Sequence, residues 1–197
     1  MRGLGGKLLP DSHVYAEMGD SVIICVVDVT CADLEGGTLV TADEIRECLE
    51  RGPLFDGYIV KHGFVPFLRD YDLVVVAVAS PPRRPQYLYR FSHVPFATVT
   101  TAVSDEVWRK SWADDYTNFQ TWQRVGSPPG YVWGVCYSVA YPGAKCVEDS
   151  ILAREWSSRL GKPMHEVQIK TNGHDLTLIF HDLNMEEQGE ASESVSV

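Results

Sequence analysis

Basic residues are scarce in this sequence relative to acidic ones. The 197 residues contain 17 Lys and Arg against 27 Asp and Glu, which gives a formal net charge of −10 at pH 7. Because nucleic-acid binding needs clustered Lys and Arg that neutralise phosphates, we expect no nucleic-acid partner. The same negative charge is repelled by anionic membrane surfaces and favours a basic protein partner.

Long apolar runs and closely spaced cysteines are also missing. No stretch approaches the roughly 20 apolar residues of a membrane-spanning helix, so we expect no membrane association. The first ten residues carry positive charge without a long apolar segment, which predicts that there is no signal peptide. The cysteines, at positions 25, 31, 48, 136 and 146, are odd in number and lack tight spacing, which favours reduced thiols in a cytoplasmic protein.

Short motifs for metal or phosphate chemistry are absent as well. The sequence contains no HExxH, no paired CxxC and no glycine-rich phosphate loop. It therefore names no cofactor, and an active site would have to be assembled from residues dispersed along the chain. Cys136 lies in the middle of an apolar strand pattern, which indicates an inert core thiol and not a nucleophile.

The strongest pattern that is present predicts a β-hairpin near the C-terminus. Asn172-Gly173 lies between two runs of alternating apolar and polar residues, which is typical of a two-residue turn. The turn fixes the pairing of the two strands: Thr171 with His174, Ile169 with Leu176, Val167 with Leu178, and His165 with Phe180. One face of the hairpin is then continuously apolar and must be covered by other parts of the fold.

Periodicity elsewhere predicts further helices and strands. Helices are expected at 41–51, about 104–122 and 149–160, and strands at 22–29, 58–65, 73–79, 87–92 and 131–141. The first helix begins with a capping box from Thr41 to Glu44, and Asp149 is the expected cap of the last one. Residues Ile151, Leu152, Trp156 and Leu160 are expected to face inward from that last helix.

These elements predict a single α+β domain over residues 1–184. We expect one mixed, mostly antiparallel sheet of about seven strands, packed by three helices. The order of elements also allows two pseudo-duplicated βαββ halves with a cleft between them. Residues 185–197 are rich in Glu and Ser and contain no Lys or Arg, which predicts a disordered acidic tail.

Aromatic residues gather in two segments. The first is a stripe at helical spacing, which is more typical of a core than of a cofactor site: Trp108, Trp112, Tyr116, Phe119 and Trp122. The second is the large face of the strand at 131–141, which would build core or line a cleft: Tyr131, Trp133, Tyr137 and Tyr141. We take these four, with Arg69 as an anion-binding group, as candidate ligand-binding residues.

Polar residues between two predicted strands are the candidates for catalysis. His62 precedes a bend at Gly63, and Asp70 and Tyr71 follow Arg69 before the next strand. With His93, these residues offer the groups that acid–base chemistry uses: His62, Asp70, Tyr71 and His93. An ordinary surface turn can have the same composition, and a turn without a catalytic role is therefore the alternative interpretation.

Two further places could carry charge-dependent chemistry. Glu166 and His181 lie near the same end of the hairpin and are candidate metal ligands, with a solvated charged rim as the alternative. Asp28 ends an apolar strand and needs a partner, for which Arg69 or His62 would serve.

Two hypotheses about function follow. In the first, the chain is an acidic binding or interaction protein that holds a small molecule or a protein partner in an aromatic-lined cleft. In the second, it is an enzyme with a dispersed His, Asp, Arg and Tyr site, with or without a metal.

Overall fold

The computed structural model describes residues 41–66, 69–78, 84–111, 118–128, 132 and 137–191. In these ranges the helices are α1 (Ala42–Glu50), α2 (Asp105–Ser111), α3 (Phe119–Arg124) and α4 (Ile151–Leu160). The strands are β1 (Tyr58–Phe64), β2 (Tyr71–Val76), β3 (Pro85–Ser92), β4 (Phe96–Thr101), β5 (Ser138–Val139), β6 (Gly143–Cys146), β7 (His165–Lys170), β8 (His174–Phe180) and β9 (Asp182–Glu190). The predicted α+β class is confirmed.

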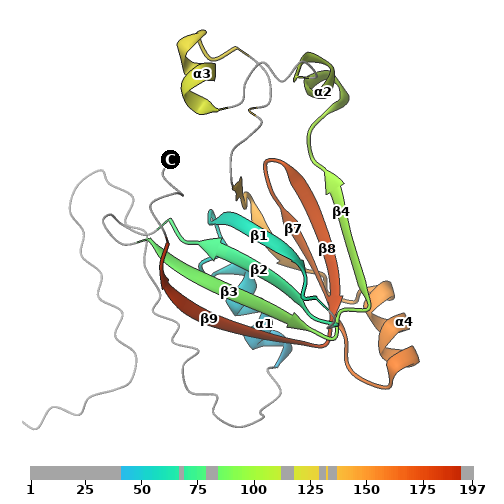
Figure 1. The fold of residues 1–197 in the computed structure, drawn as a ribbon. Helices are drawn as coiled ribbons and strands as arrows, with labels where there is room; N and C mark the ends of the chain where they lie inside the picture. The colour runs from blue at the N-terminus through green and yellow to red at the C-terminus, as the bar shows by residue number, and fades with distance from the viewer. Residues whose placement is uncertain are drawn as a thin grey trace, which may run out of the picture.

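The described strands form two antiparallel sheets instead of the single sheet that we predicted. One sheet has five strands in the order β5-β1-β2-β3-β9, and the other has four in the order β4-β8-β7-β6. Figure 1 shows the two sheets facing each other and meeting at one end. None of the helices in the described ranges is long and apolar enough to cross a bilayer.

Two segments of the chain run through both sheets. One segment is β3 followed by β4, and the other is β8 followed by β9. β3 pairs with β9 in the five-stranded sheet, and β4 pairs with β8 in the four-stranded sheet. The bend lies at His93, whose φ of 52° is left-handed, and beside it the His181 amide donates to the Ser92 carbonyl at 3.0 Å. Side-chain alternation does not record such a bend, which is why the sequence suggested a single sheet.

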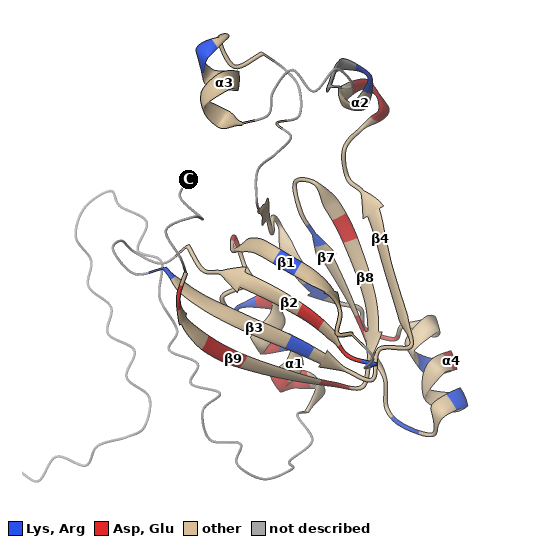
Figure 2. Ribbon diagram, in the orientation of Figure 1, with Lys and Arg blue, Asp and Glu red and all other residues tan. Residues whose placement is uncertain are grey.

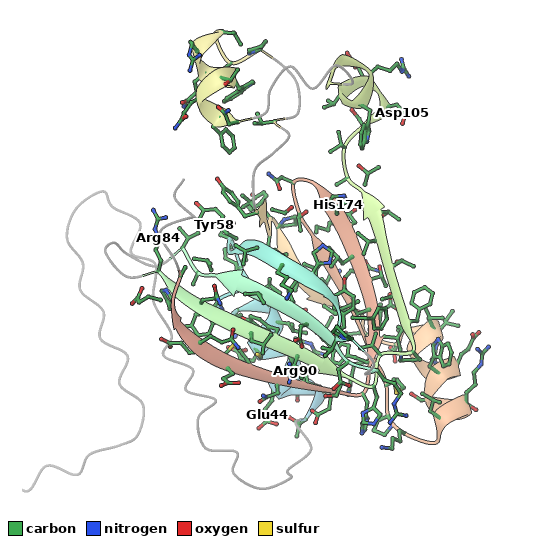
Figure 3. All side chains as sticks on the ribbon, in the orientation of Figure 1. Glu44, Tyr58, Arg84, Arg90, Asp105 and His174 are labelled. Carbon is green, nitrogen blue, oxygen red and sulfur yellow. The ribbon has the colours of Figure 1, made fainter. Side chains whose placement is uncertain are left out.

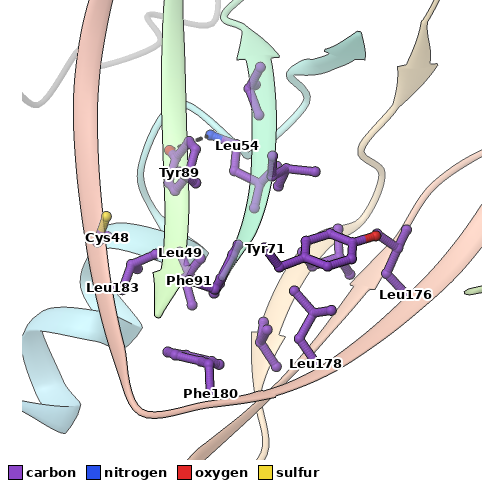
Figure 4. Close-up of a cluster of buried hydrophobic side chains, with 14 of the residues drawn as sticks. Cys48, Leu49, Leu54, Tyr71, Tyr89, Phe91, Leu176, Leu178, Phe180 and Leu183 are labelled. Carbon is purple, nitrogen blue, oxygen red and sulfur yellow. Dashed lines mark hydrogen bonds between the residues drawn. The ribbon is translucent and has the colours of Figure 1, made fainter. Parts of the chain in front are cut away.

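The main core lies between the inner faces of the two sheets, and α1 contributes to it. Figure 4 shows side chains from both sheets meeting there, with Phe91 and Phe180 packed edge to face at 5.0 Å between ring centroids. The Leu54 amide donates to the Tyr89 hydroxyl at 3.1 Å, so two buried polar groups satisfy each other. From α1 come Ile45, Cys48 and Leu49, which are the buried residues of this helix.

Several local predictions are confirmed. β7 pairs with β8 in the predicted register, with His165 opposite Phe180 and Val167 opposite Leu178. The Thr41 capping box is present at the start of α1. Gly161 ends α4 in the left-handed conformation that glycine adopts at little cost.

Other local predictions are wrong. Residues 185–190, which we assigned to a disordered tail, belong to β9, and Met185 packs against the core. The backbone pairing with β3 and the inward side chains outweigh the acidic composition of this strand, because its Glu side chains remain exposed. Residues 192–197 lie outside the described part of the chain.

The helices differ from the predictions in extent and in facing. The expected helix at 104–122 is represented by the separate helices α2 and α3, and α3 has no buried residue. In α4 the N-cap is Ser150, and Ile151 and Leu160 are exposed, contrary to our expectation. Ala153 is buried there with Met164 and Ile179, so α4 covers the hairpin.

Of the strands predicted at 22–29 and 131–141, only part of the second lies in the described residues. The first lies outside the described residues, as do 131 and 133–136 of the second. The described remainder of the second contains the two-residue strand β5, which pairs with the start of β1. The pseudo-duplicated βαββ arrangement therefore stays a prediction.

Candidate functional site

A hydrogen bond joins two of the residues that the sequence nominated for catalysis. Nδ1 of His62 lies 2.7 Å from the hydroxyl of Tyr71. β1 carries His62 opposite Leu73 of β2, on the inner side of the sheet, and Tyr71 begins β2 with its ring buried. Figure 4 shows the Tyr71 hydroxyl directed away from its own sheet, toward Leu176 of β8. The pair therefore sits where the inner faces of the two sheets meet.

Partial desolvation of His62, whose side chain still reaches solvent, and burial of Tyr71 determine the protonation of this pair. Desolvation lowers the pKa of His62, and the nearby His174 lowers it further, so the imidazole is neutral at pH 7. Burial raises the pKa of Tyr71, which keeps its phenol protonated. A buried hydroxyl needs an acceptor, and Nδ1 of His62 can accept its proton. In that arrangement Nε2 of His62 carries the imidazole proton, since a neutral ring has one N–H.

Two residues that sequence reasoning did not nominate lie beside this pair. The Phe64 ring is 52% exposed and packs edge to face on Tyr71, at 5.2 Å between ring centroids. His174 alternates along β8 with Leu176 and Leu178, so it belongs to the inner face, and Figure 3 labels it near the start of that strand. We call His62, Phe64, Tyr71 and His174 the His62 cluster. The alternation of Phe64 with His62 on β1 was the signal available in the sequence.

The other nominated polar residues build the bend between the sheets. One oxygen of the Asp70 carboxylate accepts the His93 backbone amide at 3.0 Å, and the Arg69 carbonyl accepts the Val94 amide at 2.7 Å. The His93 ring lies edge to face on His181, at 5.8 Å between centroids. Among the described side chains, Nδ1 of His93 is buried without a hydrogen-bond partner. Asp70 and Arg69 thus hold the chain in its left-handed turn. They are close in sequence to Tyr71 of the His62 cluster, but their hydrogen-bond partners are the backbone amides of His93 and Val94.

The two candidate metal ligands contact different partners. Glu166 accepts hydrogen bonds from the hydroxyl of Ser150 and from the side chain of Gln168, the latter at 3.1 Å. Nδ1 of His181 lies 2.8 Å from the Pro163 carbonyl, to which it donates. Within the described residues, no three His, Cys, Asp or Glu side chains are arranged to hold a metal ion.

The predicted aromatic cleft is only partly covered by the structure. Tyr131 and Trp133 lie outside the described residues. Tyr137 packs against Tyr58 of β1, at 4.7 Å between ring centroids, whereas Tyr141 is 65% exposed. Asp28 and Cys136 also lie outside the described range. Of the two described thiols, Cys146 has a pKa raised to about 11, mainly by burial, which suits an inert core residue.

The lowered pKa values of two histidines predict how the free energy of unfolding changes at acidic pH. Burial lowers the pKa of His165, and His181 lowers it further while Asp182 opposes the shift; the pKa of His62 is lowered as well. In the pH window between these lowered pKa values and the ordinary histidine pKa of about 6.5, the unfolded chain therefore binds more protons at these histidines than the folded chain. The free energy of unfolding should fall as the pH drops through that range and be fully retained above it.

Urea unfolding of the wild type and of the His62→Gln/His165→Gln variant between pH 8 and pH 5 measures this effect. The variant should lose part of the pH dependence because glutamine does not titrate. An equal slope in both proteins would contradict the assignment.

The architecture defines an α+β protein with two antiparallel sheets and a polar and aromatic cluster between them. The segments β3–β4 and β8–β9 bend and run through both sheets, and we call them together the bent ribbon. The chain belongs to the YxiG-like protein family, whose sequence model matches residues 41–195. That range begins at the N-cap of α1 and contains every helix and strand described here, including β9. Comparisons with curated proteins and with solved structures found no match.

Proposed function

We propose that this YxiG-like protein is a binding protein that holds a small molecule at the His62 cluster. The observation that carries the proposal is the pairing of an exposed phenylalanine with a histidine that a buried tyrosine orients. Phe64 is 52% exposed although it belongs to the inner side of its sheet, and His62 is fixed through Nδ1 at 2.7 Å. Ligand sites commonly combine an apolar surface with a few oriented polar groups.

The chemistry of the cluster indicates a class of ligand. Nε2 of a neutral His62 offers one N–H donor, which suits an oxygen acceptor such as a carboxylate or carbonyl group. The Phe64 ring offers an apolar face that an aromatic group can pack against. A small molecule that joins an apolar ring to an acceptor oxygen would use both. The basic protein partner suggested by the net charge of −10 stays a separate prediction.

Saturation-transfer NMR with benzoate and phenylacetate as probes tests the proposal. We expect probe signals with the wild type and a loss of about tenfold in affinity for His62→Gln and for Phe64→Ser, which corresponds to about 1.4 kcal/mol for each contact. Phe55→Ser is the matched control because Phe55 is 53% exposed in the segment between α1 and β1. Equal binding by the Phe64 and Phe55 variants, or no binding by the wild type, would refute the proposal.

The hydrogen bond between His62 and Tyr71 also favours a second candidate function, an acid–base enzyme. If the Nδ1–H of His62 donates to the Tyr71 oxygen, the lone pair of Nε2 becomes available as a general base, with Tyr71 as its positioning residue. Hydrolysis of p-nitrophenyl acetate by the wild type separates the two. An enzyme should lose turnover in His62→Gln and change its pH profile in Tyr71→Phe, whereas a binding protein shows no turnover above the buffer rate.

A further inference from the structure

β4 is an edge strand without charge. It ends the four-stranded sheet, and its pairing with β8 runs without a register shift from Phe96 to Thr101. Figure 1 places it at the border of the molecule, and in Figure 2 no acidic or basic residue interrupts it. Its last four residues, Thr98 to Thr101, are exposed, with Val99 at 46%. β-branched residues of this kind favour pairing with another strand.

The other sheet edges in the described residues differ from β4. β9 ends the five-stranded sheet and carries four acidic residues, and β6 carries Lys145. β5, at the remaining edge, has only two described strand residues. Charge and short length are the usual means by which proteins prevent an edge from pairing with another chain. β4 is six residues long and lacks both protections.

The backbone of β4 has a defined set of outward-pointing groups. The Ala102 amide donates to the Gly173 carbonyl of the β8 side at 3.0 Å. Because these groups alternate in direction along an antiparallel strand, Thr98 and Thr100 also point their amides and carbonyls at β8. Ala97, Val99 and Thr101 therefore point theirs outward, away from the sheet.

We propose that β4 pairs in antiparallel fashion with β4 of a second copy of this chain, about a two-fold axis at Val99. The outward groups are self-complementary in this register, because Ala97 faces Thr101 of the second copy and Val99 faces itself. Each facing pair exchanges two backbone hydrogen bonds, about six in all. The pairing joins the two four-stranded sheets into one continuous sheet, and Thr98 lies opposite Thr100, a favourable cross-strand pair.

The surroundings of β4 favour a second copy over an extended segment of another protein. Figure 1 shows α2 at the end of β4 and α4 at its start, so antiparallel pairing brings α2 of one copy to the side of α4 of the other. The first turn of α2 carries Asp105 and Glu106, with Arg109 further along the helix, and α4 carries Arg154 and Arg159 against Glu155. The acidic first turn of α2 in one copy would thus lie beside a helix with an excess of one positive charge in the other, since α4 has two Arg and one Glu.

Sedimentation equilibrium of the full chain over a concentration series tests the proposal. We expect the wild type to reach a mass of twice 22.0 kDa, and Val99→Pro to remain at 22.0 kDa. Proline removes an amide that points outward, so the ladder with β8 is kept while the central pair of the interface is lost. Val99→Thr is the matched control, because it keeps both the amide and the β-branched shape, and it should dimerise like the wild type.

A second variant covers the case in which proline disturbs the fold. Thr98→Lys/Thr100→Lys places lysines opposite each other across the two-fold axis and should give a monomer at the same concentrations, whereas Thr98→Ser/Thr100→Ser should stay dimeric. Circular dichroism of each variant checks that the sheet is retained. A monomeric wild type throughout the series would overturn the proposal, and so would a dimer that persists in a folded Thr98→Lys/Thr100→Lys variant. A wild-type monomer would leave a strand from another protein as the remaining occupant.

Discussion

Replacing Phe180 by alanine should lower the free energy of unfolding by about 3–5 kcal/mol, the usual cost of removing a buried phenylalanine. Phe180 is fully buried at the end of β8, where its ring packs on Phe91 at 5.0 Å and on His165 at 5.7 Å between centroids. The three rings belong to three different strands near the bend, β3, β7 and β8. The backbone there is held by hydrogen bonds on both sides, so the cavity has little freedom to collapse.

Urea unfolding followed by circular dichroism measures this effect. Phe55→Ala is the matched control, since a residue that is 53% exposed should change stability by less than about 1 kcal/mol. A double replacement of Phe91 and Phe180 should cost less than the sum of the two single replacements, because the rings contact each other. A loss below about 1 kcal/mol for Phe180→Ala would mean that the two sheets do not pack as described.

Ending the chain at Asn184 should cost at least about 3 kcal/mol of unfolding free energy and could prevent folding altogether. The truncation removes the part of β9 that pairs with Tyr89, Leu88 and Tyr87. It also removes Met185, which packs against the core with its sulfur 3.8 Å from that of Cys48. Full burial of a methionine contributes about 1.5–3 kcal/mol, and because Met185 is half-buried, much of the loss comes from uncovering β3.

A control separates backbone pairing from charge in this experiment. Glu186→Gln removes one exposed negative charge from β9 and keeps the strand, so it should stay within about 0.5 kcal/mol of the wild type. A truncated chain as stable as the full chain would show that residues 185–197 form the acidic tail that composition alone suggested.

The parts of the fold that depend on neighbouring residues were predictable from the sequence. The Asn172-Gly173 turn determined the pairing of β7 with β8, and Thr41 with Glu44 determined where α1 begins. In both cases the contacts lie within a few residues of each other, so local propensity and side-chain alternation are sufficient.

The division into two sheets was not predictable in the same way. It depends on a left-handed residue at His93 and on a carbonyl and a carboxylate, from Arg69 and Asp70, that hold the bend. None of these has a local signature. β9 was missed because its composition is that of a solvated tail, and only its position beside β3 explains why it is ordered.

In the candidate site, too, the contacts between residues close in sequence were predictable and those between the two sheets were not. The sequence placed His62 and Tyr71 in one polar group, and the structure brings their side chains within 2.7 Å. It also suggested Asp70 and His93 for chemistry, whereas their contacts serve the backbone of the bend. The contributions of Phe64 and His174 depend on how the two sheets face each other, which a single sequence does not encode locally.

The bent ribbon has a consequence for how this chain reaches its native state. Hydrogen bonds of β3, and of Arg84 just before it, reach residues of β9 that are 102 and 106 positions away: Gln86 bonds with Gln188, and Arg84 with Glu190. Such distant pairings carry a high loop-closure entropy and slow folding. The four-stranded sheet cannot be completed until synthesis of the chain has passed β8, and the five-stranded sheet cannot be completed until it has passed β9. A ribosome-bound intermediate would therefore expose the inner faces of both sheets, which makes translation speed and chaperone access relevant to its yield.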